Sequence, residues 1–308
     1  MKVLSFDIGG TKIAAAVIGE QGQFFSEKKI ATPIQSWPEA RQALVELGKG
    51  ILAEHPEIKA CGISSAGPLH AASGRLLFPT NMMAWGEVDL TRELQTEFGI
   101  PVQLENDAAA AVIGEHWLGE FKNSSSLLMI TLGTGLGVGL MVDHELSRGG
   151  RGFHPEGGHL LLQLGDDSAL CACGNFGCAE AYLAGSHFLR RARLRFQDPG
   201  LTPETLIEKA KTQDPLAMEL FENYSLRLAQ FIFNYMMLSY PYAVVLGGSF
   251  AQSSAYFLPR TFSHLDRFLE KRPSDWMPKI SVSQLNNAGL LGAAKLAFKQ
   301  LGQPSQIK

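Results

Sequence analysis

One short stretch, EGGHLLLQLGDDSALCACGNFGCAE at positions 156–180, limits most strongly what this chain can fold into. It contains Cys171, Cys173 and Cys178, three of the four cysteines of the chain, and it also contains His159. Three thiolates and one imidazole match a tetrahedral zinc site, because zinc binds both sulfur and nitrogen ligands. Four protein ligands leave no open position for a catalytic water, so the pattern predicts a structural zinc ion. Buried or redox-paired cysteines are the alternative.

Glycines and acidic residues complete this stretch. Gly174 and Gly177 allow the backbone to turn tightly between closely spaced ligands. Glu156 and Glu180 border the stretch, and each lies beside a residue that the metal would immobilise. We therefore expect both carboxylates to belong to a polar ligand pocket, although a solvated surface charge is the usual state of a glutamate.

Near the N-terminus, two apolar runs at 3–6 and 13–18 surround a Gly-Gly turn and predict a β-hairpin. The backbone N–H groups of such a turn can bind phosphate oxygens, and Thr11 and Lys12 add side-chain donors. Asp7, directly before the turn, could hold a magnesium ion through water.

The same arrangement returns later in the chain. A predicted strand at 126–131 leads into LGTGLG at 132–137, and a second strand continues to about Val142. A strand and not a helix follows the glycines, so the segment does not match a dinucleotide-binding fingerprint. Two hairpins of one kind suggest an internal duplication in which each half offers a phosphate-binding turn.

A short predicted strand at 102–104 runs into Glu105-Asn106-Asp107 and then into an alanine-rich helix. Either Asn106 or Asp107 is a good helix N-cap. However, the C-terminal end of a strand that meets a helix is also where α/β proteins place ligand-binding groups. The helix dipole would favour the ionised form of Asp107.

Four motifs occur in the order DIGGTK, ENDA, LGTGLGVG, and EGGH with CACGNFGCAE. Together they resemble the signature of the ROK family of sugar kinases and related repressors, in the actin/hexokinase superfamily, over nearly the whole chain. The resemblance implies an α/β fold, namely the two-lobed actin-like (duplicated ribonuclease H-like) ATPase fold with an interlobe cleft and a structural zinc loop. We expect a small lobe from residues 1–117 and 288–308. Residues 118–287 would form a large lobe with the zinc loop and the adenosine-binding part.

The resemblance implies an ATP-dependent sugar kinase that phosphorylates the 6-hydroxyl of a hexose. Glucose is favoured because PTNMMAWGEVDL at 79–90 resembles the ROK glucokinase loop. N-acetylglucosamine or N-acetylmannosamine is the alternative acceptor, followed by fructose. Trp85 in this loop either closes off the space beside the sugar 2-position or anchors the loop to the core. A sugar-responsive repressor is not expected, because the first strand begins at about Val3 and the kinase motifs are intact.

The resemblance also assigns roles to individual residues. Asp107 is expected to be the catalytic base, and Ala109 stands where the family pattern commonly has asparagine, which can alter the packing of the helix start. The expected sugar-binding residues are Asn81, Asn106, Asp107, Glu156, His159 and Glu180. The expected ATP and Mg²⁺ residues are Asp7, Gly9, Gly10, Thr11, Lys12, Gly133, Thr134, Gly135, Gly247 and Gly248. The expected zinc ligands are His159, Cys171, Cys173 and Cys178.

Length and composition set the remaining expectations. The 308 residues suggest two domains, and a net charge of -3 argues against nucleic acid as the main partner. No apolar run approaches the roughly 20 residues that span a bilayer, and the N-terminal run is too short for a signal peptide. We expect a cytoplasmic homodimer that binds a hexose and ATP, uses Mg²⁺ and a structural Zn²⁺, and has no membrane or nucleic-acid partner.

Overall fold

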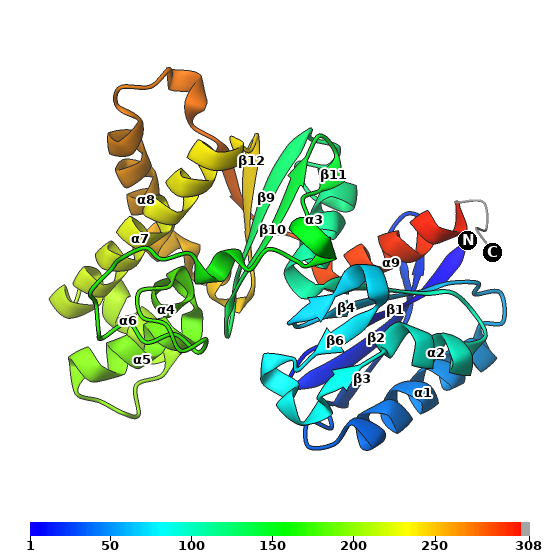
Figure 1. The fold of residues 1–308 in the computed structure, drawn as a ribbon. Helices are drawn as coiled ribbons and strands as arrows, with labels where there is room; N and C mark the ends of the chain where they lie inside the picture. The colour runs from blue at the N-terminus through cyan, green and yellow to red at the C-terminus, as the bar shows by residue number, and fades with distance from the viewer. Residues whose placement is uncertain (303–308) are drawn as a thin grey trace. The chain divides into compact units, whose positions relative to one another are not determined.

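A computed structural model of the chain describes residues 1–302 and divides it into two compact units. Unit 1 contains Met1–Asn123, Gly139–Pro155 and the residues from Gln284 onward. Unit 2 contains Ser124–Val138 and Glu156–Ser283. Each unit combines strands with helices (Figure 1), so the predicted α/β fold is confirmed.

The first sheet has the order β3-β2-β1-β4-β8. Its first three strands in the chain pair antiparallel, whereas β1, β4 and β8 pair parallel. The strands of this sheet are β1 (Lys2–Ile8), β2 (Lys12–Gly19), β3 (Phe24–Ala31), β4 (Cys61–Ser65) and β8 (Val102–Asn106). The predicted hairpin around Gly9 and Gly10 is therefore the β1–β2 hairpin.

The second sheet has the order β11-β10-β9-β12-β13. The strands are β9 (Ser126–Leu132), β10 (Leu136–Val142), β11 (Glu145–Leu146), β12 (Ala243–Gly247) and β13 (Lys279–Val282). The central strand is β9, with β10 and β11 on one side of it and β12 and β13 on the other. The first sheet has the same plan, with β1 at its centre, β2 and β3 on one side and β4 and β8 on the other. The repeated strand order confirms the internal duplication that the two Gly-Thr hairpins predicted.

Helices cover both faces of the first sheet. Leu4, Phe6 and Ile8 on β1 point to a core built with α1 (Trp37–Glu54) and α2 (Leu90–Phe98). Side chains alternate along a strand, so Val3, Ser5 and Asp7 face the opposite side, where α9 (Ala288–Leu301) packs. The Ser5 hydroxyl donates to the carbonyl of Leu290 at 2.6 Å. In Figure 1, α9 is the red helix that lies along this sheet on the side opposite α1.

Helix α3 (Asp107–Leu118) packs on α9 with their backbones in close contact. A Cβ atom at Gly292 would lie 1.7 Å from the carbonyl oxygen of Ala110, and one at Gly114 would lie 2.4 Å from that of Ala288. No other residue fits at these two positions without separating the helices. The contact holds α3, and with it the ENDA motif, against the rest of unit 1.

The small third sheet, β5-β6-β7, also belongs to unit 1. Its strands are β5 (Leu69–His70), β6 (Arg75–Leu77) and β7 (Glu87–Val88), and the 3₁₀ helix η2 (Thr80–Trp85) lies between β6 and β7. The helices of unit 2 are α4 (Ala179–Leu183), α5 (Gly185–Phe196), α6 (Pro203–Lys211), α7 (Pro215–Ser239) and α8 (Ser254–Leu269).

Helix α7 forms the centre of the core of unit 2. Phe221 and Tyr224 on this helix are buried and pack edge-on or tilted against Phe188 of α5. Tyr224 also packs against Phe257 of α8, and its hydroxyl donates to the carbonyl of Leu183 at 3.0 Å. This aromatic core fixes α4 and α5, the helices that follow the cysteine-rich stretch.

Candidate functional site

The first Gly-Gly turn is held closed by its own backbone and by the residue that follows β3. The N–H of Gly9 donates to the carbonyl of Lys12 at 3.0 Å, and the hydroxyl of Thr32 donates to the carbonyl of Gly9 at 2.6 Å. Thr11 and Lys12 are exposed at the surface. Their side chains therefore remain available to an anion that approaches the turn.

Asp7 lies at the base of this turn, on the sheet face covered by α9. The hydroxyl of Ser64 donates to its Oδ1 at 2.7 Å. Burial raises the pKa of Asp7, and the Ser64 hydrogen bond and the charge of Lys12 only partly offset that rise. A partly buried carboxylate with one oxygen already bound to a hydroxyl can still offer its other oxygen to a cation or to a metal-bound water.

The structure brings Asn81 to the same turn, although the two are distant in the chain. A Cβ atom at Gly10 would lie 2.5 Å from the Cβ of Asn81, so the two backbones approach closely. Asn81 belongs to η2 and is exposed. Trp85, at the end of η2, is buried; its Nε1–H donates to the carbonyl of Pro33 at 3.0 Å, and its ring packs on Trp37. Of the two roles open to Trp85, the structure shows that of a loop anchor.

At the start of α3, Asn106 and Asp107 have different environments. Asn106 is buried and is the N-cap, since its Oδ1 accepts the N–H groups of Ala108 at 2.9 Å and Ala109 at 3.3 Å. Asp107 is exposed, and its Oδ1 accepts the N–H of Ala108 at 2.8 Å. The helix end therefore presents an accessible carboxylate whose charge the N-terminal dipole stabilises. Ala109 is fully buried in the first turn.

The sequence interpretation missed one pair beside this motif. Glu105, the residue before Asn106, is buried and forms an ion pair with Arg148. A long-range contact of this kind has no local sequence signal; the only hint was an acidic residue near the end of a mostly buried strand.

In unit 2, the second turn is held by α5. The N–H of Gly185 donates to the carbonyl of Gly133 at 2.8 Å, and the hydroxyl of Ser186 donates to the carbonyl of Thr134 at 2.5 Å. The predicted Gly-Gly pair at the end of β12 lies beside the same turn. Gly248 has a positive φ of 84°, and a Cβ there would lie 2.4 Å from the carbonyl oxygen of Leu132. Gly133, Thr134, Gly135 and Gly248 thus gather at one end of the second sheet.

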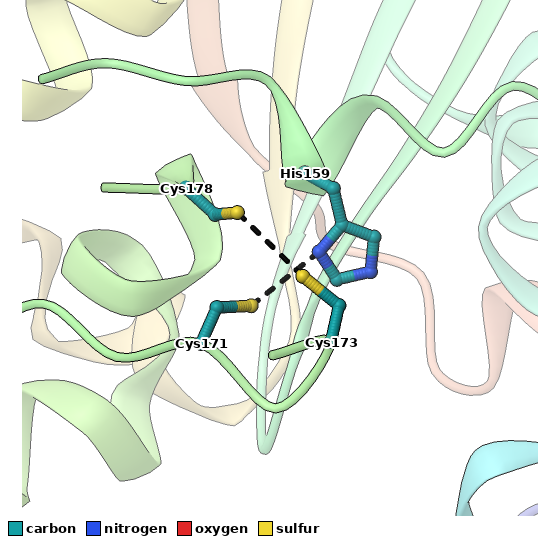
Figure 2. Close-up of side chains that lie close together, drawn as sticks. All are labelled: His159, Cys171, Cys173 and Cys178. Atoms are coloured by element: carbon teal, nitrogen blue, oxygen red, sulfur yellow. Dashed lines mark hydrogen bonds between the residues drawn. The ribbon is translucent and has the colours of Figure 1, made fainter. Parts of the chain in front are cut away.

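His159, Cys171, Cys173 and Cys178 come together as predicted, with their ligand atoms within 4.8 Å of one another (Figure 2). The Sγ atoms of Cys173 and Cys178 are 3.7 Å apart, and Nδ1 of His159 is 3.5 Å from Sγ of Cys171. A zinc tetrahedron with Zn–S of about 2.3 Å and Zn–N of about 2.0 Å requires S–S and S–N separations of about 3.8 and 3.5 Å. These two separations match a metal site, and the Cys173–Cys178 separation is too long for a disulfide.

The turns that bring these ligands together depend on glycine. Gly174 and Gly177 both have positive φ, 89° and 81°. A Cβ at Gly177 would also lie 1.8 Å from the carbonyl oxygen of Gln163. Burial raises the pKa of the Cys171 thiol, so a metal would have to displace its proton on binding.

The two glutamates beside this Cys₃His cluster differ in their contacts. Glu180 connects the cluster to the second turn: its Oε2 accepts the N–H of Leu136 at 3.1 Å, and its Oε1 lies 3.3 Å from Sγ of Cys171. Glu156 is exposed at the surface, but local desolvation raises the pKa of its carboxyl, and repulsion from Glu180 adds to the rise while His159 opposes it.

The predicted residues therefore form two groups, one in each unit. Unit 1 holds Asp7, the first turn, Asn81, Asn106 and Asp107. The residues that unit 2 holds are the second turn, Gly247, Gly248, Glu156, Glu180 and the Cys₃His cluster. Within residues 1–302, no helix is long and apolar enough to cross a membrane.

Comparison with known proteins decides the family. The ROK family model matches residues 3–300, nearly the whole chain. The chain belongs to the ROK family. Two relatives of this ROK protein are a glucokinase from Streptomyces coelicolor and an N-acetylmannosamine kinase from Haemophilus influenzae. The first is 32% identical over 96% of both chains, and the second is 29% identical over 96% of this chain and 94% of the relative.

Solved structures agree with the family assignment of this ROK protein. A ROK hexokinase from Thermus thermophilus matches with a TM-score of 0.86 at 32% identity, covering 98% of this chain and 99% of the hexokinase. A ROK family glucokinase from Streptomyces griseus, solved in complex with glucose and AMPPNP, matches with a TM-score of 0.81 at 31% identity, covering 97% and 100%. The predicted actin-like α/β architecture is confirmed.

Proposed function

We propose that this ROK protein is an ATP-dependent hexose kinase that transfers the γ-phosphoryl group to the 6-hydroxyl of glucose. One observation carries the proposal: Asp107 is an exposed carboxylate at a helix N-terminus, at the end of a parallel strand, in a chain whose relatives include glucokinases. A carboxylate in this position can accept the proton of an attacking hydroxyl. Little charge develops early on that oxygen in a loose phosphoryl-transfer transition state, so an ordinary aspartate is basic enough.

The polar groups around Asp107 and in unit 2 would bind the sugar. Asn106 uses Oδ1 to cap α3, so its amide N–H₂ remains to donate to a hydroxyl. Asn81 would bind the sugar from η2, and the carboxylates of Glu156 and Glu180 would accept hydrogen bonds from sugar hydroxyls. Nδ1 of His159 faces Cys171, so Nε2 would be the atom that meets the sugar.

The phosphates of ATP would bind at the two Gly-Thr turns, with Gly247 and Gly248 next to the adenosine. A magnesium ion would shield the phosphate charge. Asp7 fits this ion, because one of its carboxylate oxygens carries the Ser64 hydrogen bond and the other can accept from a metal-bound water. Lys12, at the exposed side of the turn, would add a positive charge.

We also propose that the Cys₃His cluster holds a structural zinc ion in the reducing environment of the cytoplasm. We propose that the two units correspond to the two lobes expected with boundaries at 117 and 288, with the difference that Gly139–Pro155 groups with unit 1.

We propose a homodimer as well. The cysteine-rich stretch exposes Leu161 and Leu164, which are 52% and 79% accessible, with Leu160, Leu170 and Phe176 nearby in the chain. Several exposed apolar side chains within one segment favour association. Sedimentation as a monomer at micromolar concentration would exclude the dimer.

The acceptor sugar is tested by kcat/KM for glucose, N-acetylglucosamine, N-acetylmannosamine, mannose and fructose under one set of conditions. We expect glucose to give the highest value. A site built to hydrogen-bond a 2-hydroxyl can reject an analogue that lacks it by about 10⁴-fold. Trp85 is anchored to Pro33, so selection against an acetamido group would come from other side chains. An acetamido sugar that exceeds glucose tenfold or more would replace glucose with an N-acetylhexosamine and leave the kinase assignment in place.

The contact between Gly10 and Asn81 makes a prediction about sugar affinity. In Gly10→Ala, the new methyl group would lie 2.5 Å from Cβ of Asn81, so η2 must shift and the Asn81 amide must move with it. We expect the Kd for glucose without ATP to rise by about tenfold, the cost of one misplaced hydrogen bond of roughly 1.4 kcal/mol. Calorimetric titration measures this value.

Gly9→Ala is the matched control for that titration. A Cβ at Gly9 meets only the carbonyl oxygen of Lys12, at an ordinary 3.5 Å, and does not approach Asn81. Its Kd for glucose should stay within about twofold of wild type. Equal losses in the two variants would show that Asn81 does not bind the sugar.

A further inference from the structure

An ion pair joins the strand before Asp107 to a loop that follows β11. Nη2 of Arg148 donates to Oε2 of Glu105 at 2.5 Å. Only 2% of the Glu105 side chain is exposed, compared with 42% for Arg148. A carboxylate removed from water in this way needs a cation beside it, because an unpaired buried charge is strongly destabilising. Arg148 supplies that cation from the solvent side.

The other oxygen of the same carboxylate contacts the ENDA motif. Oε1 of Glu105 accepts the backbone N–H of Asn106 at 3.0 Å. Asn106 in turn caps α3 through the N–H groups of Ala108 and Ala109. A continuous set of hydrogen bonds therefore leads from Arg148, through Glu105 and Asn106, to the first turn of α3, where Asp107 lies.

Both ends of this set are fixed by backbone pairing. Glu105 pairs with Ser64 of β4 in the parallel register of the first sheet. On the loop, the N–H of Ser147 donates to the carbonyl of Leu140 at 2.8 Å, and the N–H of Gly149 donates to the carbonyl of Phe153 at 3.0 Å. Arg148 lies between these two hydrogen bonds, so its side chain starts from a defined backbone position.

We propose that Arg148 is a positioning residue for phosphoryl transfer: through Glu105 it fixes the direction in which Asn106 and Asp107 present their side chains to the sugar. The inference rests on the proposed kinase function. A reacting group misplaced by about 1 Å can lose about 10²-fold in rate, so a small rotation of the strand end is enough to matter. Arg148 acts through Glu105 and is not assigned any contact with the substrates.

The test compares kcat and the KM for ATP in Arg148→Met, Arg148→Lys and Arg41→Met. Arg41 pairs with Glu93 and Glu97 in the same unit, with a similar exposure of 37%, but it lies on α1 away from the ENDA motif. We expect Arg148→Met to lower kcat by about tenfold or more and to leave the KM for ATP within about twofold. Arg148→Lys should recover part of kcat, and Arg41→Met should keep it.

The pair is tested further by adding Glu105→Gln to Arg148→Met. The glutamine side chain carries no unpaired charge, and its amide oxygen can still accept the N–H of Asn106, so kcat should rise above that of Arg148→Met alone. If Arg148→Met does not fold, kcat is compared instead in Arg148→Lys and Glu105→Gln, because each of these variants keeps one native partner and a polar side chain at the other position. A loss of kcat in Arg41→Met equal to that in Arg148→Met would overturn the inference.

Amide hydrogen exchange tests the effect of the Glu105–Arg148 pair on the start of α3 independently of activity. We expect Arg148→Met to accelerate exchange at Ala108 and Ala109, whose N–H groups Asn106 caps, and Arg41→Met to leave these two amides unchanged. Wild-type protein that phosphorylates no sugar would refute the proposed function, whereas unchanged exchange and unchanged kcat in Arg148→Met would refute the positioning role.

Discussion

Asp107→Asn should lower kcat by at least about 10²-fold, the lower range for loss of a general base. The substitution preserves the shape of the side chain and removes its proton acceptor. Glucose and ATP binding should persist, because the two turns and Asn81 are unchanged. Steady-state kinetics in an assay that couples ADP release to NADH oxidation, together with calorimetric binding of both substrates, measure the separate effects on kcat and on affinity.

Asp89→Asn is the matched control for this variant. Asp89 is the N-cap of α2, and its Oδ1 accepts the N–H of Arg92, so it is a second carboxylate at a helix start of unit 1, outside the proposed site. Asparagine retains an Oδ1 acceptor at both positions, for Arg92 in α2 and for Ala108 in α3, so both variants should keep their stability within about 0.5 kcal/mol. If Asp107→Asn turned over sugar as fast as Asp89→Asn, Asp107 would be a structural residue.

Cys178→Ala should remove the zinc ion and destabilise unit 2. Cys178 is fully buried, and its Sγ is 3.7 Å from that of Cys173, so the remaining three ligands cannot complete the tetrahedron. Structural zinc contributes roughly 10–16 kcal/mol of apparent binding energy in small peptides. We expect Tm to fall by about 5 °C or more, the shift that roughly 2 kcal/mol produces in a domain of this size.

Loss of zinc should also weaken sugar binding. The Glu180 carboxylate lies next to Cys171 and accepts the N–H of Leu136. Disorder in the cysteine-rich stretch would therefore leave this carboxylate without a fixed position from which to bind the sugar. Cys61→Ala is the control, because Cys61 is equally buried but lies in β4, outside the cluster. It should lose packing energy and keep one zinc per chain by metal analysis. Wild-type protein without zinc, or Cys178→Ala with unchanged Tm and glucose affinity, would contradict the account.

Local sequence patterns predicted the features of this protein that depend on neighbouring residues. The β1–β2 hairpin around Gly9 and Gly10 follows from two apolar runs and a turn, and the Cys₃His cluster follows from ligand type and spacing. A helix start is equally local, yet the pattern left Asn106 and Asp107 as equal candidates for the cap. The structure separates them, because Asn106 is buried and Asp107 is exposed.

Contacts between distant residues could not be predicted in this way. The approach of Asn81 to Gly10 depends on how η2 packs on the first sheet, and the Glu105–Arg148 pair joins residues 43 positions apart. Ser36-Trp37-Pro38-Glu39 has the residue types of a capping box, and α1 does begin directly after Ser36. The Ser36 side chain nevertheless makes no capping hydrogen bond, because the residue types alone do not fix the side-chain rotamer.

The kinase assignment is tested most directly by ³¹P NMR of wild-type protein with ATP, Mg²⁺ and glucose. We expect one phosphate monoester on the 6-oxygen of glucose to form for each ADP, and ATP to be consumed far more slowly when the sugar is omitted. ATP that is hydrolysed to inorganic phosphate at the same rate with and without sugar, or that is not consumed while glucose binds, would contradict it.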